Sequence, residues 1–160
     1  MKIALGSDHR GHEVHGHLAQ WLAQQEYEVA EMGPQDNRPC DYPDSSYLVG
    51  RAVADGVASF GILVDGSGIG MCIAANKVRG VRAALVHDEI GAEISRRHSD
   101  ANVLCLPADM LGQRIIDRLV RTWLTTEFEG GRHARRVRKI CAIEQGLDPQ
   151  TVDDSAAMSE

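Results

Sequence analysis

Short apolar runs alternate with amphipathic segments along most of the chain. Five runs are bounded by turn-forming residues and have the length and composition of strands. They span residues 2–5, 27–32, 60–64, 81–86 and 102–106. The third and fourth runs are mostly apolar at consecutive positions, which predicts strands that are buried on both faces.

Between these runs, apolar residues recur at helical spacing. The residues that mark the expected helices are Val14, Leu18, Trp21 and Leu22; Leu48, Val49, Ala52 and Val53, after Pro43; Ile90, Ile94 and His98, after the cap Asp88; and Leu111, Ile115, Leu119, Val120 and Trp123. A shorter helix is expected to start within residues 71–76. Because Ile90, Ile94 and His98 share one helix face, we expect that face to point inward.

Strands that alternate with helices in this way indicate an α/β fold. We predict a Rossmann-like three-layer sandwich with a five-stranded parallel sheet. In such sheets ligands bind at the carboxyl ends of the strands. Asp8 and His9 follow the first strand and a glycine-rich loop follows the third, so we expect them to meet at one edge of the sheet.

One more helix is expected over residues 131–145. Its apolar positions are Val137, Ile140, Cys141 and Ile143. The sheet already has its covering helices, so we expect this C-terminal helix to pack on a partner subunit. We interpret residues 1–145 as a single domain and residues 146–160 as a polar, loosely ordered tail.

Composition narrows the class of protein. A chain of 160 residues can bury a core without disulfides or a structural metal. The four cysteines form no C-x-x-C pair, which favours reduced thiols over a zinc site. The formal net charge of −6 disfavours nucleic acid, and neither a membrane span nor a signal peptide is found. We therefore expect a cytoplasmic protein that binds neither nucleic acid nor membrane.

The stretch VDGSGIGMC, residues 64–72, is the clearest candidate for a ligand-binding loop. Its glycines allow close backbone approach, and free N–H groups of the following helix attract negative charge. The alternative is a tight turn that needs glycine for steric reasons alone. The loop lacks the P-loop G-K-[ST] and the spacing of the dinucleotide fingerprint, so we expect no nucleotide cofactor.

Arginines and histidines supply further candidates. Arg132 and Arg136 are one helical turn apart near a helix N-terminus, where positive charges are unfavourable unless an anion compensates them. The alternative is a solvated basic face. His98 is either a proton-exchanging group or a core histidine. The cluster HRGHEVHGH, residues 9–17, has no metal-site spacing, and we expect no metal.

Five separate motifs carry a resemblance to a known family. They are Asp8-His9, DYP at 41–43, GSGIGMCIAANK at 66–77, RRHSDANVL at 96–104 and EGGRHARRV at 129–137. In this order they resemble the ribose-5-phosphate isomerase B and galactose-6-phosphate isomerase family over about residues 1–145. The resemblance implies an aldose–ketose isomerase of phosphorylated sugars, without metal or cofactor. It also implies a homodimer or tetramer whose active sites are shared between subunits.

The resemblance also implies roles for particular residues. They are ring opening for His98; contacts to sugar hydroxyls for Asp8, Tyr42 and Ser99; phosphate binding for His9, Arg132 and Arg136; and stabilisation of the enediolate by Ser67 and the loop Gly66, Gly68, Gly70 and Met71. Relatives usually carry their base as a cysteine at the position of Asp65 or a glutamate at that of Met71. At the position of Asp109 they often carry an arginine that contributes to the phosphate site.

We therefore expect Asp65 to be the base that moves the proton, with Cys72 as the alternative. The reaction is expected to be the interconversion of ribose 5-phosphate and ribulose 5-phosphate, or that of a related pentose, tetrose or hexose phosphate. A sugar-phosphate-binding regulatory module without catalysis is the second hypothesis.

Overall fold

Five strands form one sheet in the order β2-β1-β3-β5-β4, and every neighbouring pair is parallel. The computed structural model describes residues 1–34 and 36–152. The strands are β1 (Lys2–Ser7), β2 (Glu28–Met32), β3 (Phe60–Asp65), β4 (Ala83–Leu85) and β5 (Val103–Pro107). The chain leaves β1 for the edge strand β2 and returns to β3 on the other side of β1. This change of direction puts a ligand-binding switch point between β1 and β3.

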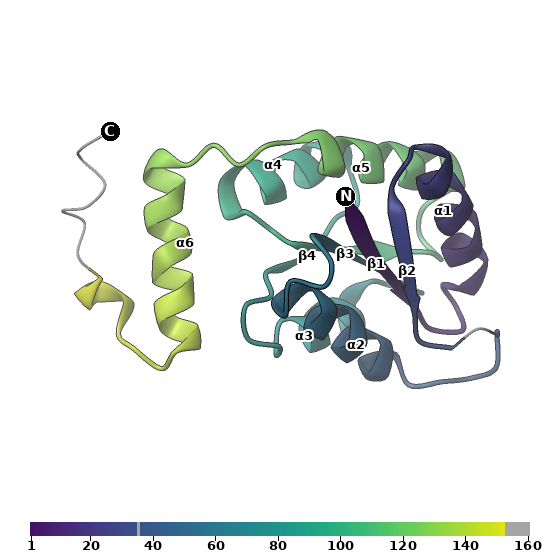
Figure 1. Ribbon diagram of the computed structural model, residues 1–160, viewed down its shortest axis with the longest axis horizontal. Coiled ribbons are helices and arrows are strands. Elements are labelled where there is room, and N and C mark those ends of the chain that lie inside the picture. The colour runs from purple at the N-terminus through teal and green to yellow at the C-terminus, as the bar shows by residue number, and fades with distance from the viewer. Residues whose placement is uncertain (35, 153–160) are drawn as a thin grey trace.

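Helices cover both faces of the sheet (Figure 1). They are α1 (His12–Gln24), α2 (Tyr42–Ala54), α3 (Ile69–Ala75), α4 (Glu89–Ser99) and α5 (Gln113–Thr125). One face carries α1, α4 and α5, and the other carries α2 and α3. The predicted three-layer sandwich is confirmed.

The strands alternate between two apolar cores. In β1, Ile3 and Leu5 pack under α1 and α5, while Ala4 points toward α2. Residues of β3 and β5 follow the same two-residue period. Both faces of the central strands are therefore buried, which matches their continuous apolar sequence.

The inward face of α4 differs from the prediction. Ile90 is 70% exposed and Ile94 is 44% exposed, whereas Ala92 and Arg96 are buried. The guanidinium of Arg96 lies 4.5 Å from the ring centroid of Phe60 and 5.5 Å from that of Trp123. Aromatic ring faces attract a cation, which allows the charged side chain of Arg96 to be buried. The helix face with Ile90 and Ile94 therefore points outward.

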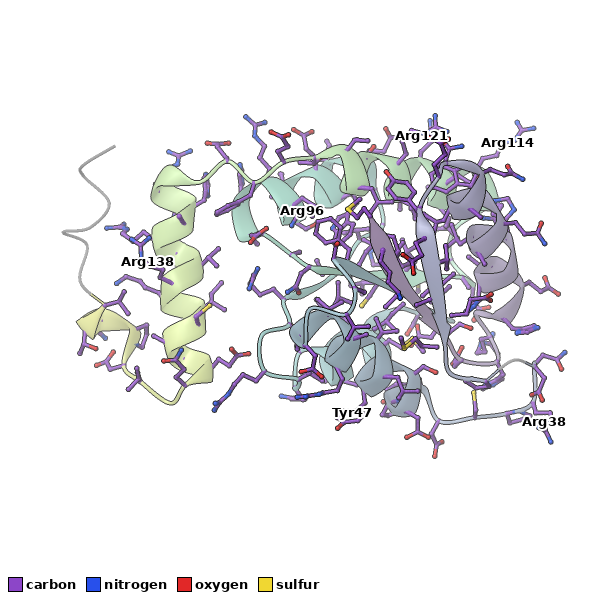
Figure 2. All side chains as sticks on the ribbon, in the orientation of Figure 1. Arg38, Tyr47, Arg96, Arg114, Arg121 and Arg138 are labelled. Atoms are coloured by element: carbon purple, nitrogen blue, oxygen red, sulfur yellow. The ribbon has the colours of Figure 1, made fainter. Side chains whose placement is uncertain are left out.

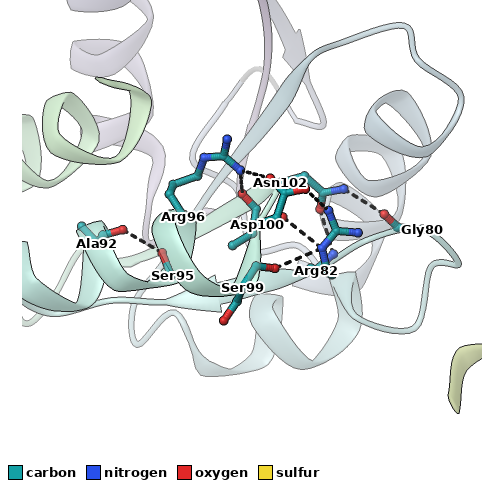
Figure 3. A network of polar contacts seen from close by, with 9 residues as sticks. Gly80, Arg82, Ala92, Ser95, Arg96, Ser99, Asp100 and Asn102 are labelled. Atoms are coloured by element: carbon teal, nitrogen blue, oxygen red, sulfur yellow. Dashed lines mark hydrogen bonds and ion pairs between the residues drawn. The ribbon is translucent and has the colours of Figure 1, made fainter. Parts of the chain in front are cut away.

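Arg96 belongs to a polar network at the C-terminal end of α4 (Figure 3). Its Nη1 donates to Asp100 Oδ1 at 2.7 Å and to the carbonyl of Ala101 at 2.8 Å. Asp100 has a positive φ of 46° and also pairs with Arg82 at 2.9 Å. At the other end of the helix, Asp88 accepts from the N–H of Gly91 at 2.7 Å, which confirms the predicted cap.

Helix α6 (Gly131–Glu144) lies outside the three layers, at one end of the long axis of the molecule, and its first turn contacts α4 (Figure 1). Its Ile140 and Ile143 are 46% and 60% exposed. Figure 2 shows Arg138 on the side of α6 that faces away from the sheet. A cleft of about 430 Å³ lies between the C-terminal part of this helix, β4 and α4.

The chain ends beyond α6 with a short turn. A 3-10 helix, η1 (Pro149–Thr151), lies within the tail that was expected to be loosely ordered, and Asp148 caps it. Residues 153–160 of that tail lie outside the described residues. In the described part of the chain, no helix is long and apolar enough to cross a membrane.

Candidate active site

Three carboxylates gather where the central strands end. Asp8 follows β1, Asp65 is the last residue of β3, and Asp109 lies two residues beyond β5. Strand pairing sets Ser7 beside Val64 and Asp65 beside Pro107, so the three loops open on one cleft. The cleft measures about 370 Å³ and is lined by Asp8, Arg10, Tyr42, Asp65, Gly66, Ser67, Gly70, Asp109 and Met110. This volume lies within the usual range for small-molecule sites.

Asp65 is held by backbone N–H groups of the loop that follows it. Its Oδ1 accepts from the N–H of Ser67 at 3.0 Å and from that of Gly68. Its Oδ2 accepts from the N–H of Met71 at 3.3 Å. Two of the loop donors that were expected to hold a substrate oxyanion thus hold the Asp65 carboxylate instead.

The environment of Asp65 makes it a stronger base than an ordinary aspartate. Only 3% of the residue is exposed. Burial raises the pKa of its carboxyl, the nearby charge of Asp8 adds to that effect, and the N–H groups of Gly68 and Met71 oppose it. A carboxylate with a raised pKa in a ligand-sized cleft is a typical proton-transfer group.

Each glycine of the loop has a structural reason. A side chain at Gly66 would collide with Arg10 and Asp109, and one at Gly70 would lie 2.7 Å from Cζ of Tyr42. Gly68 has a φ of 73°, which favours glycine. The glycines therefore fit a tight turn, and that the loop also binds a ligand stays a prediction.

Asp8 and Ser67 are fixed by the same kind of local bonding. Asp8 is 6% exposed, and its Oδ1 accepts from the N–H groups of Arg10 and Gly11 at 2.9 and 3.0 Å. The hydroxyl of Ser67 accepts from the N–H of Ile69 at 3.3 Å. Tyr42, which is 41% exposed, closes the cleft over Gly70.

Cys72, the alternative base, lies away from the cleft. Its thiol faces the carbonyl of Ala83 at 3.5 Å and the amide of Asn76 at 3.6 Å. A hydrogen bond with Cys105 lowers the pKa of Cys72 to about 7. The thiol is therefore ionisable, but Cys72 is not among the residues that line the cleft. This position favours Asp65 over Cys72 as the base.

The other expected site residues gather at a second place. His98 and Ser99 end α4, and Arg132 and Arg136 lie in the first turns of α6. The ring of His98 stacks on that of buried His133. Within the described part of the chain, none of these residues lines the cleft. The expected site residues therefore form two separate groups in a single chain.

His9, the third residue expected to bind phosphate, belongs to neither of the two groups. It follows Asp8, but its Nδ1 accepts from the N–H of Cys40 at 3.4 Å, and it does not line the cleft. Its expected contact with phosphate stays a prediction.

One cluster among the described residues has the composition of a metal site. Ligand atoms of His98, Glu129 and His133 all lie within 4.8 Å of one another. Glu129 also pairs with Arg97 at 2.8 Å, and this ion pair lowers the pKa of its carboxyl. The cluster is therefore accounted for as an ion-pair network. In the segment 9–17, His15 is buried against Ser7 and Glu31, and His17 bonds Asp117.

Arg10 and Met110 line the cleft but were not expected from the sequence, and Arg10 is the charged one of the two. It pairs with Asp109, which is 99 positions further along the chain. The one signal in the sequence is its place two residues after Asp8, in a loop expected at the binding edge of the sheet.

Comparison with known proteins matches residues 3–140 to the Ribose/Galactose Isomerase family. The chain is 40% identical to ribose-5-phosphate isomerase B of Escherichia coli, over 90% of this chain and 97% of that protein. It is 38% identical to D-erythrulose-4-phosphate isomerase of Pectobacterium atrosepticum, over 88% of this chain and 93% of that protein. The structure of Clostridium thermocellum ribose-5-phosphate isomerase B superimposes with a TM-score of 0.90 at 44% identity, covering 91% of this chain and 99% of that chain.

Proposed function

Because the chain belongs to the ribose/galactose isomerase family and is an aldose–ketose isomerase of sugar phosphates, we propose that Asp65 carries the proton between C1 and C2 of the substrate. The observation that carries this proposal is a nearly buried carboxylate with a raised pKa in the cleft at the switch point of the sheet. Abstraction of a carbon-bound proton needs such a base beside the reacting carbons.

The N–H donors of the loop can stabilise negative charge both before and after the proton transfer. In the resting cleft, the N–H groups of Gly68 and Met71 stabilise the charge on Asp65. When Asp65 takes the proton, the negative charge moves to the enediolate oxygen of the sugar. The same donors then turn to that oxygen, since neutral Asp65 binds them less strongly. Ser67 is placed to add its hydroxyl.

The residues of one protomer that line the cleft do not themselves supply a phosphate site. Three carboxylates and one guanidinium line the cleft, which leaves a formal excess of two negative charges. A phosphate dianion is repelled there, whereas the neutral hydroxyl end of a sugar is accepted through hydrogen bonds. Arg132 and Arg136, exposed at the start of α6, supply the positive charge that a phosphate needs.

A second copy of the chain brings these two halves together. In one protomer, α6 and the β1–α1 connection lie toward opposite ends of the molecule (Figure 1). Exposed isoleucines on three helices offer an apolar surface for a partner: Ile69 and Ile73 on α3, Ile90 and Ile94 on α4, and Ile140 and Ile143 on α6. The proposed assembly is a homodimer or tetramer in which the partner's α4 and α6 provide ring opening by His98 and phosphate binding.

The proposed substrate is a phosphorylated aldose whose phosphate is several carbons from the carbonyl, because base and arginines come from different halves of the site. Pentose and tetrose phosphates meet this condition, and the names of the E. coli and P. atrosepticum relatives fall in these two classes. A cytoplasmic location is proposed as well, since the four cysteines are free thiols.

Solvent-deuterium incorporation tests the role of Asp65. The wild-type protein in D2O is offered a panel of pentose, tetrose and hexose phosphates, and deuterium at C2 is measured. Asp65→Asn is expected to lower exchange by about 100-fold or more while substrate affinity changes little. Asp44→Asn, an exposed aspartate in the first turn of α2, is the matched control. Near-normal exchange by Asp65→Asn would refute the proposal, and binding without exchange by the wild type would favour a regulatory module.

A further inference from the structure

An ion pair between two distant loops forms one wall of the cleft. Nε of Arg10 donates to Oδ2 of Asp109 at 2.6 Å, and Nη2 approaches the same oxygen at 2.5 Å. Arg10 lies in the loop after β1, and Asp109 lies in the loop after β5. Both residues line the cleft together with Asp8 and Asp65. The pair therefore joins two loops of the site.

The pair rests directly on the glycine that follows the proposed base. A methyl group added to Gly66 would lie 2.5 Å from Asp109 Oδ2 and 2.7 Å from Arg10 Nε. The backbone is fixed there as well, because the N–H of Asp109 donates to the carbonyl of Gly66 at 3.1 Å. Arg10 is tied from the other side, since its N–H donates to Asp8 Oδ1 at 2.9 Å. These bonds hold Arg10 in the wall of the cleft that Asp65 and Asp8 also line.

The pair retains capacity for a ligand. A guanidinium has five N–H groups, and the bonds to Asp109 engage one on Nε and one on Nη2. Both of these bonds end on Oδ2, so Asp109 Oδ1 can still accept a hydrogen bond. The side chains are 58% and 42% exposed on the cleft side of Gly66. A donor and an acceptor side by side match a hydroxyl group, which accepts and donates at once.

Charge selects between the two kinds of oxygen in a sugar phosphate. Asp109 neutralises Arg10, and Asp8 and Asp65 add two further carboxylates to the cleft. The neutralised guanidinium has little attraction for a phosphate dianion, while a neutral hydroxyl can donate to the carboxylates and accept from the guanidinium.

We propose that Arg10, positioned by Asp109, binds the hydroxyl and carbonyl oxygens of the sugar beside the reacting carbons, and thereby contributes to the choice of substrate. This inference rests on the proposed function of the cleft as the place where the carbonyl end of the sugar reacts. Arg10 is a binding residue in this role, and Asp109 is a positioning residue.

A purely structural role predicts different behaviour. Half-exposed ion pairs contribute little to stability, so loss of this one should leave the protein folded. Arg51 and Asp55 form a comparable pair on α2, with bonds of 2.8 and 2.9 Å and side chains that are both 48% exposed. These two residues do not line the cleft, so the pair is a matched control.

The test compares Arg10→Met, Arg10→Lys, Asp109→Asn and the control Arg51→Met. Each full-length variant is assayed with ribose 5-phosphate, or with whichever sugar phosphate of the deuterium panel the wild type turns over faster. Inorganic phosphate is titrated as a competitive inhibitor, and thermal unfolding is recorded for every variant. Arg10→Met is expected to lower kcat/KM by about 10- to 100-fold, mainly through KM, because it removes hydrogen bonds from a charged donor. Arg10→Lys should recover part of the loss, Asp109→Asn should lose several-fold, and Arg51→Met should match the wild type.

The inhibition constant for phosphate decides which end of the sugar Arg10 binds. It is expected to stay within about twofold of wild type in Arg10→Met. A rise that parallels KM would mean that Arg10 binds phosphate, which overturns the proposal, and so would unchanged kcat/KM. A loss of activity that follows a loss of thermal stability in Arg10→Met and Asp109→Asn alike would also overturn it. Deuterium exchange in Asp65→Asn, which keeps Arg10, tests separately whether Asp65 is the base.

Discussion

The imidazole ring of His98 lies parallel to that of His133, with ring centroids 4.1 Å apart and an interplanar angle of 3°. His98 is in the last turn of α4, and His133 is in the first turn of α6. Glu129 lies 3.9 Å from Nε2 of His98 and 3.7 Å from Nε2 of His133. The stack therefore connects α6 to the body of the protein beside the proposed ring-opening group.

Protonation of His133 should weaken the fold. Burial lowers the pKa of His133, and the charge of His98 lowers it further. A histidine whose pKa is lower in the folded state stabilises the fold above its ordinary value of about 6.5, and this stability is lost as the pH falls through the lowered pKa. The melting temperature of wild type should fall from about pH 7.5 to about pH 5, and His133→Gln should show a smaller fall. Exposed His87→Gln is the control and should retain the wild-type slope; an equal slope in His133→Gln would contradict the prediction.

Gly68→Ala should destabilise the protein more than Gly56→Ala. Both glycines have a positive φ, 73° and 70°, so both variants incur a backbone cost of about 1–2 kcal/mol. A side chain at Gly68 would also lie 2.3 Å from Leu85 Cδ1 and 3.3 Å from the backbone of Leu106, whereas nothing lies within 4 Å at Gly56. Overpacking should add about 1–3 kcal/mol at Gly68 alone. Urea unfolding measures both variants, and equal losses would show that the loop adapts.

Arg96→Met should lower stability without affecting the cleft. The substitution removes stacking on Phe60 and Trp123 and the hydrogen bond to Ala101. Asp100 keeps its bond to Arg82, so its carboxylate is not left unpaired. The expected loss of stability is therefore about 2–3 kcal/mol, less than for a buried charge without a partner. Urea unfolding gives the loss, and Arg97→Met, which removes an exposed arginine from the same helix, should cost much less than Arg96→Met. Similar losses in the two variants would contradict the structural role of Arg96.

The strands and helices could be predicted because their apolar periods are local properties of the sequence. The inward face of α4 could not, because Arg96 is buried only through two rings that come from β3 and α5. Hydrophobic spacing favoured Ile90 and Ile94, which instead lie outward. A period identifies a helix, but the rest of the fold determines which of two faces it buries.

Part of the cleft could also be predicted from local features of the sequence. Asp8 and the glycine loop follow strands, and the rule for parallel sheets brings them together. The pairing of Arg10 with Asp109 depends on the order of strands in the sheet, which the sequence does not state. The bonds from Gly68 and Met71 to Asp65 also depend on loop geometry, so the sequence did not show that these donors hold the Asp65 carboxylate when no ligand is bound.

Asp65→Cys should move the acid limb of the activity profile to higher pH. An unperturbed thiol has a pKa of about 8.5 and a carboxyl one of about 3.9, so the substituted base loses its proton only at higher pH even though burial raises the pKa of Asp65. The profile of kcat/KM against pH from about 4 to 9 measures the shift. Cys72→Ser, which changes a thiol outside the cleft, should leave the limb in place. If Cys72→Ser moves the limb and Asp65→Cys does not, the base is Cys72.

Two inactive variants should restore activity when they are mixed. If one protomer supplies the cleft and its partner supplies α6, a heterodimer of Asp65→Asn with Arg132→Ala/Arg136→Ala has one site with both defects and one site with none. Random re-association of dimers should therefore recover about a quarter of the wild-type activity, because half of the dimers are mixed and half of their sites are intact. If each chain carried its whole site, every site of the heterodimer would contain a defect and the mixture would stay inactive. Size-exclusion chromatography of each variant before mixing verifies that both assemble, and recovered activity then requires that the arginines of α6 act in the cleft of the other subunit.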